Sequence, residues 1–220
     1  MRFIQVKEIE KNFGETKILD GISMEVNKGD FIAIMGPSGS GKSTLLYSIS
    51  AMDEISSGSV LFDGENLSEM EEEKRAQIRL KKMGFVFQNP QMLKTLTILD
   101  NIMLPGFVAK EEDADVIRDR ATRLMEEMGI SQIADRDIRK VSGGQLQRAS
   151  ICRAMINNPD VLFMDEPTGA LNSEATEQVI EILKKLNQKG VTIVMVTHDP
   201  KVAEQTKKTI YIKDGKIVGK

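Results

Sequence analysis

The segment at residues 36–44, which reads GPSGSGKST, constrains the fold of this chain more than any other. It matches the phosphate-loop pattern G-x-x-x-x-G-K-[S/T], in which glycines let the backbone turn tightly and aim its N–H groups at phosphate oxygens. An apolar run at residues 31–35 precedes it, and a helical stretch from about residue 42 to 51 follows it, as the pattern requires. The context favours a nucleotide site over a glycine-rich turn without a ligand. It does not separate an ATPase from a GTPase or a nucleoside kinase.

Every residue of this loop is a candidate nucleotide ligand. We expect Lys42 to reach the β- and γ-phosphates and to act in catalysis, and Ser43 to ligate Mg²⁺. The helix that begins near Lys42 adds its positive N-terminal end. The candidate binding residues of the loop are Gly36, Pro37, Ser38, Gly39, Ser40, Gly41, Lys42, Ser43 and Thr44.

Short apolar runs alternate with longer amphipathic stretches, which is the pattern of an α/β fold. Four runs are apolar or β-prone at every position and predict strands of a mostly parallel sheet that is buried on both faces. They are residues 31–35, 83–87, 161–164 and 191–196. Residues 3–10 and 22–26 alternate apolar with polar side chains, which predicts an N-terminal antiparallel β subdomain. Residues 209–218 predict a hairpin with an Asp-Gly turn.

The strand pattern disappears between about residues 88 and 158. Residues 110–129 have helical spacing and end at a glycine suited to cap a helix, and a second helix is expected over residues 143–157. The charged run at residues 69–82 predicts a solvated helix face. We therefore expect one domain over residues 1–220, with an α/β core and an inserted helical subdomain. The expected core spans residues 1–87 and 159–220, and the expected helical subdomain spans residues 88–158.

Composition excludes several classes of function. The net charge of −3 gives no sign of the basic surface that nucleic-acid-binding proteins need, so we expect no nucleic-acid partner. Cys152 is the only cysteine, which fits a reducing compartment, and we interpret it as a small buried hydrophobe and not as a reactive thiol. No signal peptide opens the chain, and no apolar run approaches the roughly 20 residues of a spanning helix. Any action at a membrane is therefore expected from outside the bilayer.

Two carboxylates follow the apolar run at residues 161–164. Asp165 and Glu166 would lie at the carboxyl edge of the sheet, where α/β folds place their ligands. Asp165 is suited to hold Mg²⁺ through the water shell of the ion, while Glu166 would point elsewhere and polarise an attacking water. A strand that merely ends in solvated acids is the alternative. Two acids in sequence favour hydrolysis over simple binding, because one would suffice for the metal.

Residues 141–145 read VSGGQ, directly before the expected helix at 143–157. Ser142 and Gln145 also match a helix capping box, so this segment alone leaves a structural and a functional interpretation equally open. Other motifs occur along the chain. They are Phe13, Gln88 after the run at 83–87, PTGALN at residues 167–172, and His198 in VTHD after the run at 191–196.

With the phosphate loop and the paired acids, these motifs resemble, in kind and in order, those of the ATP-hydrolysing subunits of ABC transporters. Val141 replaces the usual leucine of the LSGGQ signature, and Asn172 replaces the usual aspartate of the D-loop. The resemblance implies a phosphate-loop NTPase of the ABC type. It excludes a GTPase or a kinase, for which VSGGQ and His198 have no use. Asn caps a helix about as well as Asp, but the change removes a negative charge near the expected dimer seam.

The resemblance also implies roles for single residues. In this family two copies bind two ATP head to tail, each on one copy's phosphate loop and under the other's signature. That arrangement implies contacts to ATP from Ser142, Gly143, Gly144 and Gln145 of the second copy. Within one copy, Phe13 would stack on adenine, Gln88 would contact Mg²⁺ beneath the membrane partner, and His198 would orient the water with Glu166. Packing for Phe13, strand termination for Gln88 and a structural role for His198 are the alternatives.

The segments GFVFQNPQMLKTLTILDNIMLP and MDEPTGALNS resemble one bacterial subgroup of these ATPases. It serves macrolide export, lipoprotein release, cell-division signalling and peptide-antibiotic resistance, through an integral-membrane permease. We expect the chain to work peripherally at the cytoplasmic face of the membrane, and we favour export of or resistance to peptide antibiotics. An ABC ATPase not tied to transport is a further alternative, but the coiled coils, zinc-binding cysteines or second cassette of such chains are not visible.

Overall fold

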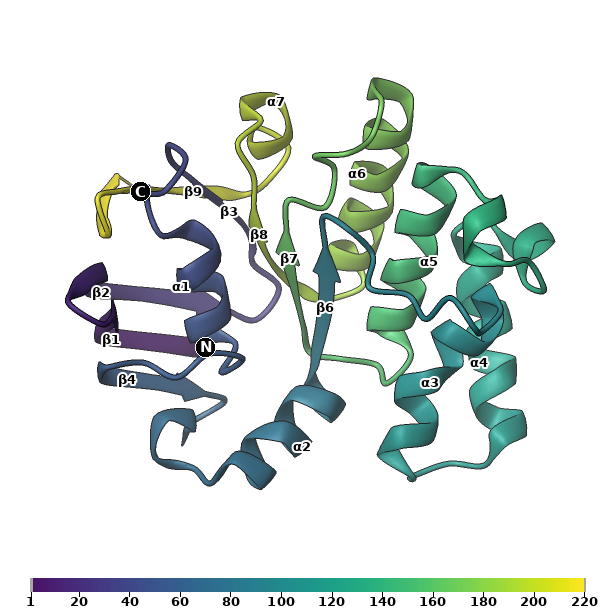
Figure 1. Cartoon of the computed structure of the whole chain (residues 1–220), viewed down its shortest axis with the longest axis horizontal. Helices are drawn as coiled ribbons and strands as arrows, with labels where there is room; N and C mark the ends of the chain where they lie inside the picture. The colour runs from purple at the N-terminus through teal and green to yellow at the C-terminus, as the bar shows by residue number, and fades with distance from the viewer. Residues whose placement is uncertain (1, 220) are drawn as a thin grey trace.

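The computed structural model describes residues 2–219 and contains two sheets, as expected. The larger has six strands in the order β10-β9-β3-β8-β7-β6, in which only the β9–β10 pair is antiparallel. Figure 1 shows this sheet running across the molecule, with helices on both sides. Its strands are β3 (Phe31–Met35), β6 (Met83–Phe87), β7 (Val161–Asp165), β8 (Thr192–Val196), β9 (Lys208–Lys213) and β10 (Lys216–Gly219).

Alternating side chains of the parallel strands enter two separate apolar cores. On β7, Leu162 and Met164 join the core that contains the helices α5 (Gly143–Met155) and α6 (Ser173–Gln188), while Val161 and Phe163 join the other. That second core contains α1 (Lys42–Ile49) and the smaller sheet. Because successive side chains of a strand point to opposite faces, these strands need apolar residues at every position. The α/β sheet predicted from the four apolar runs is confirmed.

The smaller sheet is antiparallel, with the strand order β2-β1-β4-β5. It consists of β1 (Arg2–Phe13), β2 (Thr16–Asn27), β4 (Ser57–Phe62) and β5 (Glu65–Asn66). In β2 the apolar residues Ile22, Met24 and Val26 are buried and the residues between them are exposed. This alternation is what the sequence predicted for half-exposed strands, although both strands extend beyond the predicted ranges.

Between β6 and β7 the described chain forms helices, turns and one isolated bridge that pairs Thr97 with Asp137. The helix predicted over residues 110–129 is shorter, α4 (Ala114–Glu127), because Lys110 adopts a left-handed conformation with φ of 56° and ends the preceding helix. That preceding helix, α3 (Ile98–Ala109), was not predicted. It contains Pro105, and its packing on α4 and α5 overrides the low helix propensity of proline.

The helix bundle shares one apolar core with the sheet, since Ile102, Met125 and Ile151 pack in the same cluster as Met195 of β8. A boundary between two lobes at residues 88 and 158 therefore stays a prediction. The charged run forms α2 (Glu72–Lys82), of which no residue is buried, and a short helix α7 (Pro200–Ala203) follows β8. Within residues 2–219, none of the helices is long and apolar enough to cross a bilayer.

Candidate active site

The phosphate loop joins β3 to α1, and three of its residues, Gly36, Gly39 and Gly41, have a positive φ that favours glycine. Gly36 has a φ of 154°, and a Cβ there would lie 2.0 Å from the carbonyl oxygen of Ile212 on β9. Gly41 has a φ of 95° and precedes α1 without a side-chain cap. The first N–H groups of α1 are therefore free to bind an anion. Lys42 curls over the loop, and its Nζ donates to the carbonyl oxygen of Pro37 at 2.8 Å.

Asp165 ends β7 beside this loop, and both of its carboxylate oxygens accept hydrogen bonds from α1. Ser43 Oγ donates to Oδ1 at 2.9 Å, and the hydroxyl of Tyr47 donates to Oδ2 at 2.6 Å. Burial, and then the hydrogen bond to Asp165, raise the pKa of the Tyr47 phenol well above its ordinary value, so Tyr47 stays a donor at working pH. The sequence analysis missed Tyr47. Its spacing of four residues from Ser43 on a helix could have located it.

Glu166 turns away from Asp165 because its backbone adopts a left-handed conformation, with φ of 49°. Its N–H donates to the carbonyl oxygen of Val196, which ties the turn to β8. Oε2 of Glu166 lies 2.9 Å from Nδ1 of His198, whose side chain is 67% exposed. A histidine so exposed contributes little to packing. The structure thus brings Glu166 and His198, two of the three predicted catalytic residues, together at the ends of adjacent strands.

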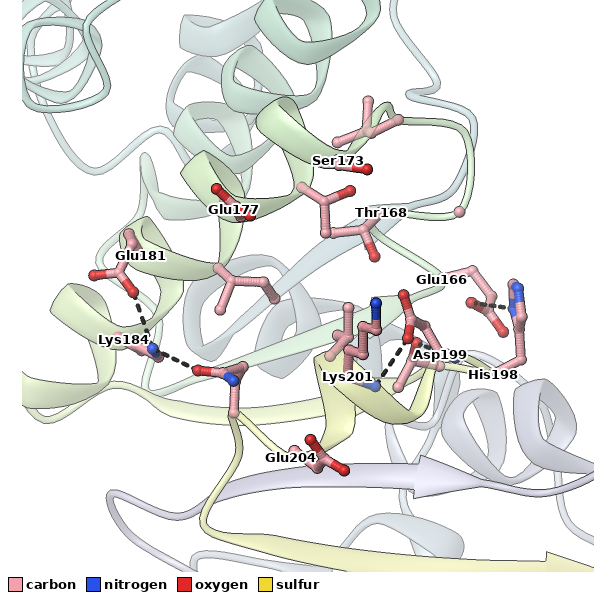
Figure 2. A pocket seen from close by; sticks show the side chains of 17 residues that line it. Glu166, Thr168, Ser173, Glu177, Glu181, Lys184, His198, Asp199, Lys201 and Glu204 are labelled. Carbon is pink, nitrogen blue, oxygen red and sulfur yellow. Dashed lines mark hydrogen bonds and ion pairs between the residues drawn. The ribbon is translucent and has the colours of Figure 1, made fainter.

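Figure 2 shows Glu166 and His198 side by side at one end of a cavity of about 750 Å³, which lies between α6 and α7. Glu166 also lines a second cavity, of about 420 Å³, over the phosphate loop. Phe13 lines that second cavity, and its ring is 54% exposed. The Nζ atom of Lys11 lies 4.8 Å from the centroid of the ring. The exposure of Phe13 disagrees with a role in core packing. The loop residues that line the second cavity are Ser38, Gly39, Gly41, Lys42, Ser43 and Thr44.

The VSGGQ segment lies elsewhere. Ser142 caps α5 in a complete capping box, in which Ser142 Oγ accepts from the Gln145 N–H at 3.3 Å and the Ser142 N–H donates to Gln145 Oε1 at 3.0 Å. Gly143 and Gly144 pack close to Leu171 and to Ala175 at the start of α6. Residues of α5 belong to one apolar core and residues of α1 to the other, so the two helices lie on opposite faces of the sheet (Figure 1). None of the VSGGQ residues lines the cavity over the phosphate loop.

Gln88 is exposed at the end of β6 and lies against the D-loop. A Cβ on Gly169 would come 2.9 Å from Gln88 Nε2. Phe87, the preceding residue, pairs in register with Asp165, so Gln88 lies at the same sheet edge as the carboxylates. The carbonyl oxygen of Phe87 accepts a hydrogen bond from Gln147 Nε2 at 3.3 Å, which connects this edge to α5. Asn172 caps α6 through its side-chain oxygen, as expected.

The donor atoms near Asp165 suit magnesium better than a transition metal. Ser43, Asp165 and Gln88 offer hard oxygen ligands, and no group of three or more His, Cys, Asp or Glu side chains within residues 2–219 could hold a metal ion. Mg²⁺ commonly binds through one or two carboxylates together with substrate phosphates and waters. The residues present therefore fit a magnesium ion that arrives with a nucleotide.

Comparison with known proteins gives a family profile described as "ABC transporter", which matches residues 19–169. The chain is 42% identical to a bacitracin export ATP-binding protein of Halalkalibacterium halodurans, over 99% of this chain and 87% of that protein. It is 40% identical to a lipoprotein-releasing system ATP-binding protein of Leptospira interrogans, over 98% and 90%. It is also 43% identical to a macrolide export ATP-binding/permease protein of Campylobacter jejuni. The match covers 98% of this chain but only 33% of that relative, so the chain spans about a third of its length.

Comparison with solved structures gives the same family. The chain is similar to the dimeric structure of MJ0796, described as a bacterial ABC transporter cassette, with a TM-score of 0.91 and 37% identity over 98% of this chain and 97% of that one. It is equally similar, with a TM-score of 0.91 and 36% identity over the same shares, to a dimeric post-hydrolysis state of that cassette bound to ADP and Pi.

Proposed function

The chain belongs to the ABC transporter family of ATP-binding cassettes, and from that premise we propose that two copies close head to tail over two ATP molecules and drive a separate membrane permease. As a member of this family the chain is an ATPase that binds ATP. One observation supports the proposal: α1, which follows the phosphate loop, and α5, which VSGGQ caps, lie on opposite faces of the sheet, and none of the VSGGQ residues lines the phosphate-loop cavity of the same copy. We infer that a second copy brings this segment to the nucleotide.

The second copy supplies what the phosphate-loop cavity lacks. Ser142 and Gly143 are exposed at the N-terminus of α5, where free N–H groups and the helix dipole attract an anion. The capping box and the signature role are compatible, because Ser142 Oγ accepts in the cap and keeps its own proton to donate. The γ-phosphate would then accept hydrogen bonds from both copies, with Gly144 and Gln145 beside Ser142. Hydrolysis removes this shared group and releases the two copies.

Within one copy, the chain's own residues divide the chemistry. Residues 36–44 bind the phosphates through backbone N–H groups, and Lys42 leaves Pro37 to contact the β- and γ-phosphates. Phe13 stacks on the base. Glu166 accepts a proton from the attacking water, and His198, whose Nδ1 lies 2.9 Å from Glu166 Oε2, contacts the γ-phosphate and orients the water with Glu166. Ser43, Asp165 and Gln88 would hold Mg²⁺, which neutralises phosphate charge when it is bound.

Our proposal for the substrate and the partner rests on the relatives and not on the site. Relatives of this chain serve bacitracin export, macrolide export and lipoprotein release, and two of the three are separate ATP-binding proteins. We assign the chain to the cytoplasmic face of a bacterial membrane, bound to an integral-membrane permease, with peptide antibiotics as the favoured cargo. A neighbouring gene for a membrane protein with a large extracellular domain would support this assignment, and a nearby sensor kinase would favour antibiotic resistance.

Two variants test the assignment of the chemistry. Glu166→Gln should keep ATP binding and lower hydrolysis by roughly 10²–10⁴-fold, the usual scale for a positioned acid-base group. Lys42→Ala should instead weaken binding of the triphosphate itself. Phosphate release and displacement of a fluorescent ATP analogue measure the two effects separately. Near-normal turnover in Glu166→Gln would show that Glu166 is not the base.

A further inference from the structure

Tyr47 has no part in the chemistry described so far, although its hydroxyl touches the carboxylate that would hold the metal. Ser43 and Tyr47 are four residues apart on α1 and therefore lie on the same face of the helix. They donate to the two different oxygens of Asp165, at 2.9 and 2.6 Å. A rotation of the carboxylate about its Cβ–Cγ bond would break both hydrogen bonds. Asp165 is thus held in one orientation from one helix.

The Tyr47 phenol is itself held in place by its surroundings. Its ring packs against Phe87, with centroids 6.5 Å apart and planes tilted by 50°, and Phe87 is the register partner of Asp165 on the neighbouring strand. The carbonyl oxygen of Tyr47 accepts hydrogen bonds from the N–H groups of Met52 and Asp53, which follow the end of α1. Both the ring and the backbone are anchored, so the hydroxyl stands at a fixed point beside Asp165.

We propose that Tyr47 is a positioning residue that holds Asp165 in the orientation in which it binds Mg²⁺ together with ATP. This role rests on the metal site of the proposed function. The outer partners of metal ligands orient them, and losing one typically costs about 10–100-fold in metal affinity or activity. Ser43 would still hold one oxygen of Asp165 when Tyr47 is changed. We therefore expect an effect of about tenfold, at the lower end of that range.

Tyr47→Phe separates the hydroxyl from the ring, because phenylalanine keeps the contact with Phe87 and loses only the donor. The test titrates Mg²⁺ into protein and a fluorescent ATP analogue, with all variants in the Glu166→Gln background to prevent hydrolysis. The Mg²⁺ concentration for half-maximal tightening should rise about tenfold in Tyr47→Phe. Nucleotide affinity in EDTA and the melting temperature should stay unchanged. Tyr211→Phe, which removes the other, exposed phenol of the chain, is the matched control and should change nothing.

The contact can also be read spectroscopically in the free protein. The chain has no tryptophan and two tyrosines, so in Tyr211→Phe its ultraviolet emission comes from Tyr47 alone. A carboxylate that accepts a hydrogen bond from the phenol quenches this emission, and adding Asp165→Asn should therefore raise it.

Three results would overturn the inference. One is a half-maximal Mg²⁺ concentration that stays unchanged in Tyr47→Phe, because the hydroxyl would then have no role at the metal site. This holds whether or not the metal-free nucleotide affinity and the melting temperature fall. Another is emission that ignores Asp165→Asn. The last is a parent protein whose nucleotide affinity ignores Mg²⁺, which alone would also remove the proposed metal site.

Discussion

Replacing Phe13 by alanine distinguishes base stacking from core packing through two quantities, the nucleotide affinity and the unfolding free energy. Phe13 is 54% exposed and lines the cavity over the phosphate loop, whereas Phe3 on the same strand is 1% exposed. Truncating a core phenylalanine costs about 3–5 kcal/mol of unfolding free energy, which is what we expect for Phe3→Ala. Phe13→Ala loses a half-exposed side chain and its contact with the ammonium of Lys11, which is only 8% exposed; such a contact is worth about 0.5–2 kcal/mol. We therefore expect it to lower the unfolding free energy by no more than about 2 kcal/mol.

The nucleotide affinity should fall as well. Stacking of an aromatic ring on a base is worth about 1–3 kcal/mol, which corresponds to a roughly 5- to 150-fold higher Kd. ATP and GTP should lose affinity alike, because a ring reads the flat face of a base and not its hydrogen-bond pattern. Displacement of a fluorescent ATP analogue and urea denaturation measure the two quantities. Tyr211→Ala is the control, since Tyr211 is 47% exposed and does not line the cavity. Unchanged Kd values with a stability loss of about 3 kcal/mol or more would refute the reasoning.

Two further predictions concern residues outside the phosphate loop. Asn172→Asp should keep the cap of α6 and leave the midpoint of urea unfolding unchanged, whereas Asn172→Ala should lower the unfolding free energy by about 1 kcal/mol. Equal losses of unfolding free energy in both variants would contradict a capping role. Burial raises the pKa of the Cys152 thiol well above its ordinary value. An aromatic disulfide reagent should therefore label no thiol in the folded protein and one thiol in guanidinium. Fast labelling of the folded protein would show that Cys152 is accessible.

Strands buried on both faces could be predicted from the sequence because they need apolar residues throughout. The runs at 31–35 and 83–87 match β3 and β6 to the residue. Helix α3 could not be predicted, because Pro105 and Gly106 lie inside it and only its packing on α4 and α5 makes it helical. A local pattern carries no information about such tertiary contacts.

Some residues of the candidate site could likewise be predicted from a local pattern, and others could not. Residues within a local motif, such as Gly36 to Thr44, were located by the pattern of the loop itself. The meeting of Glu166 with His198 required knowledge that β7 and β8 are neighbours, which the family resemblance supplied and the register confirms. Tyr47 belongs to no motif; its spacing from Ser43 indicates only that the two share a helix face, and the structure adds that its hydroxyl reaches Asp165.

The oligomeric state of Glu166→Gln tests the central claim most directly. In a single chain none of the VSGGQ residues lines the phosphate-loop cavity, and we propose that the γ-phosphate draws in a second copy to supply them. Light scattering should show monomers without nucleotide or with ADP, and dimers with ATP and Mg²⁺. Ser142→Arg in that background should abolish the dimer and leave binding of a fluorescent ATP analogue nearly intact, because each interface uses Ser142 twice. Ser131→Arg, an equal charge change at another exposed serine, should leave the dimer in place. A dimer that ignores nucleotide, or one that survives Ser142→Arg, would mean that VSGGQ serves only as a helix cap.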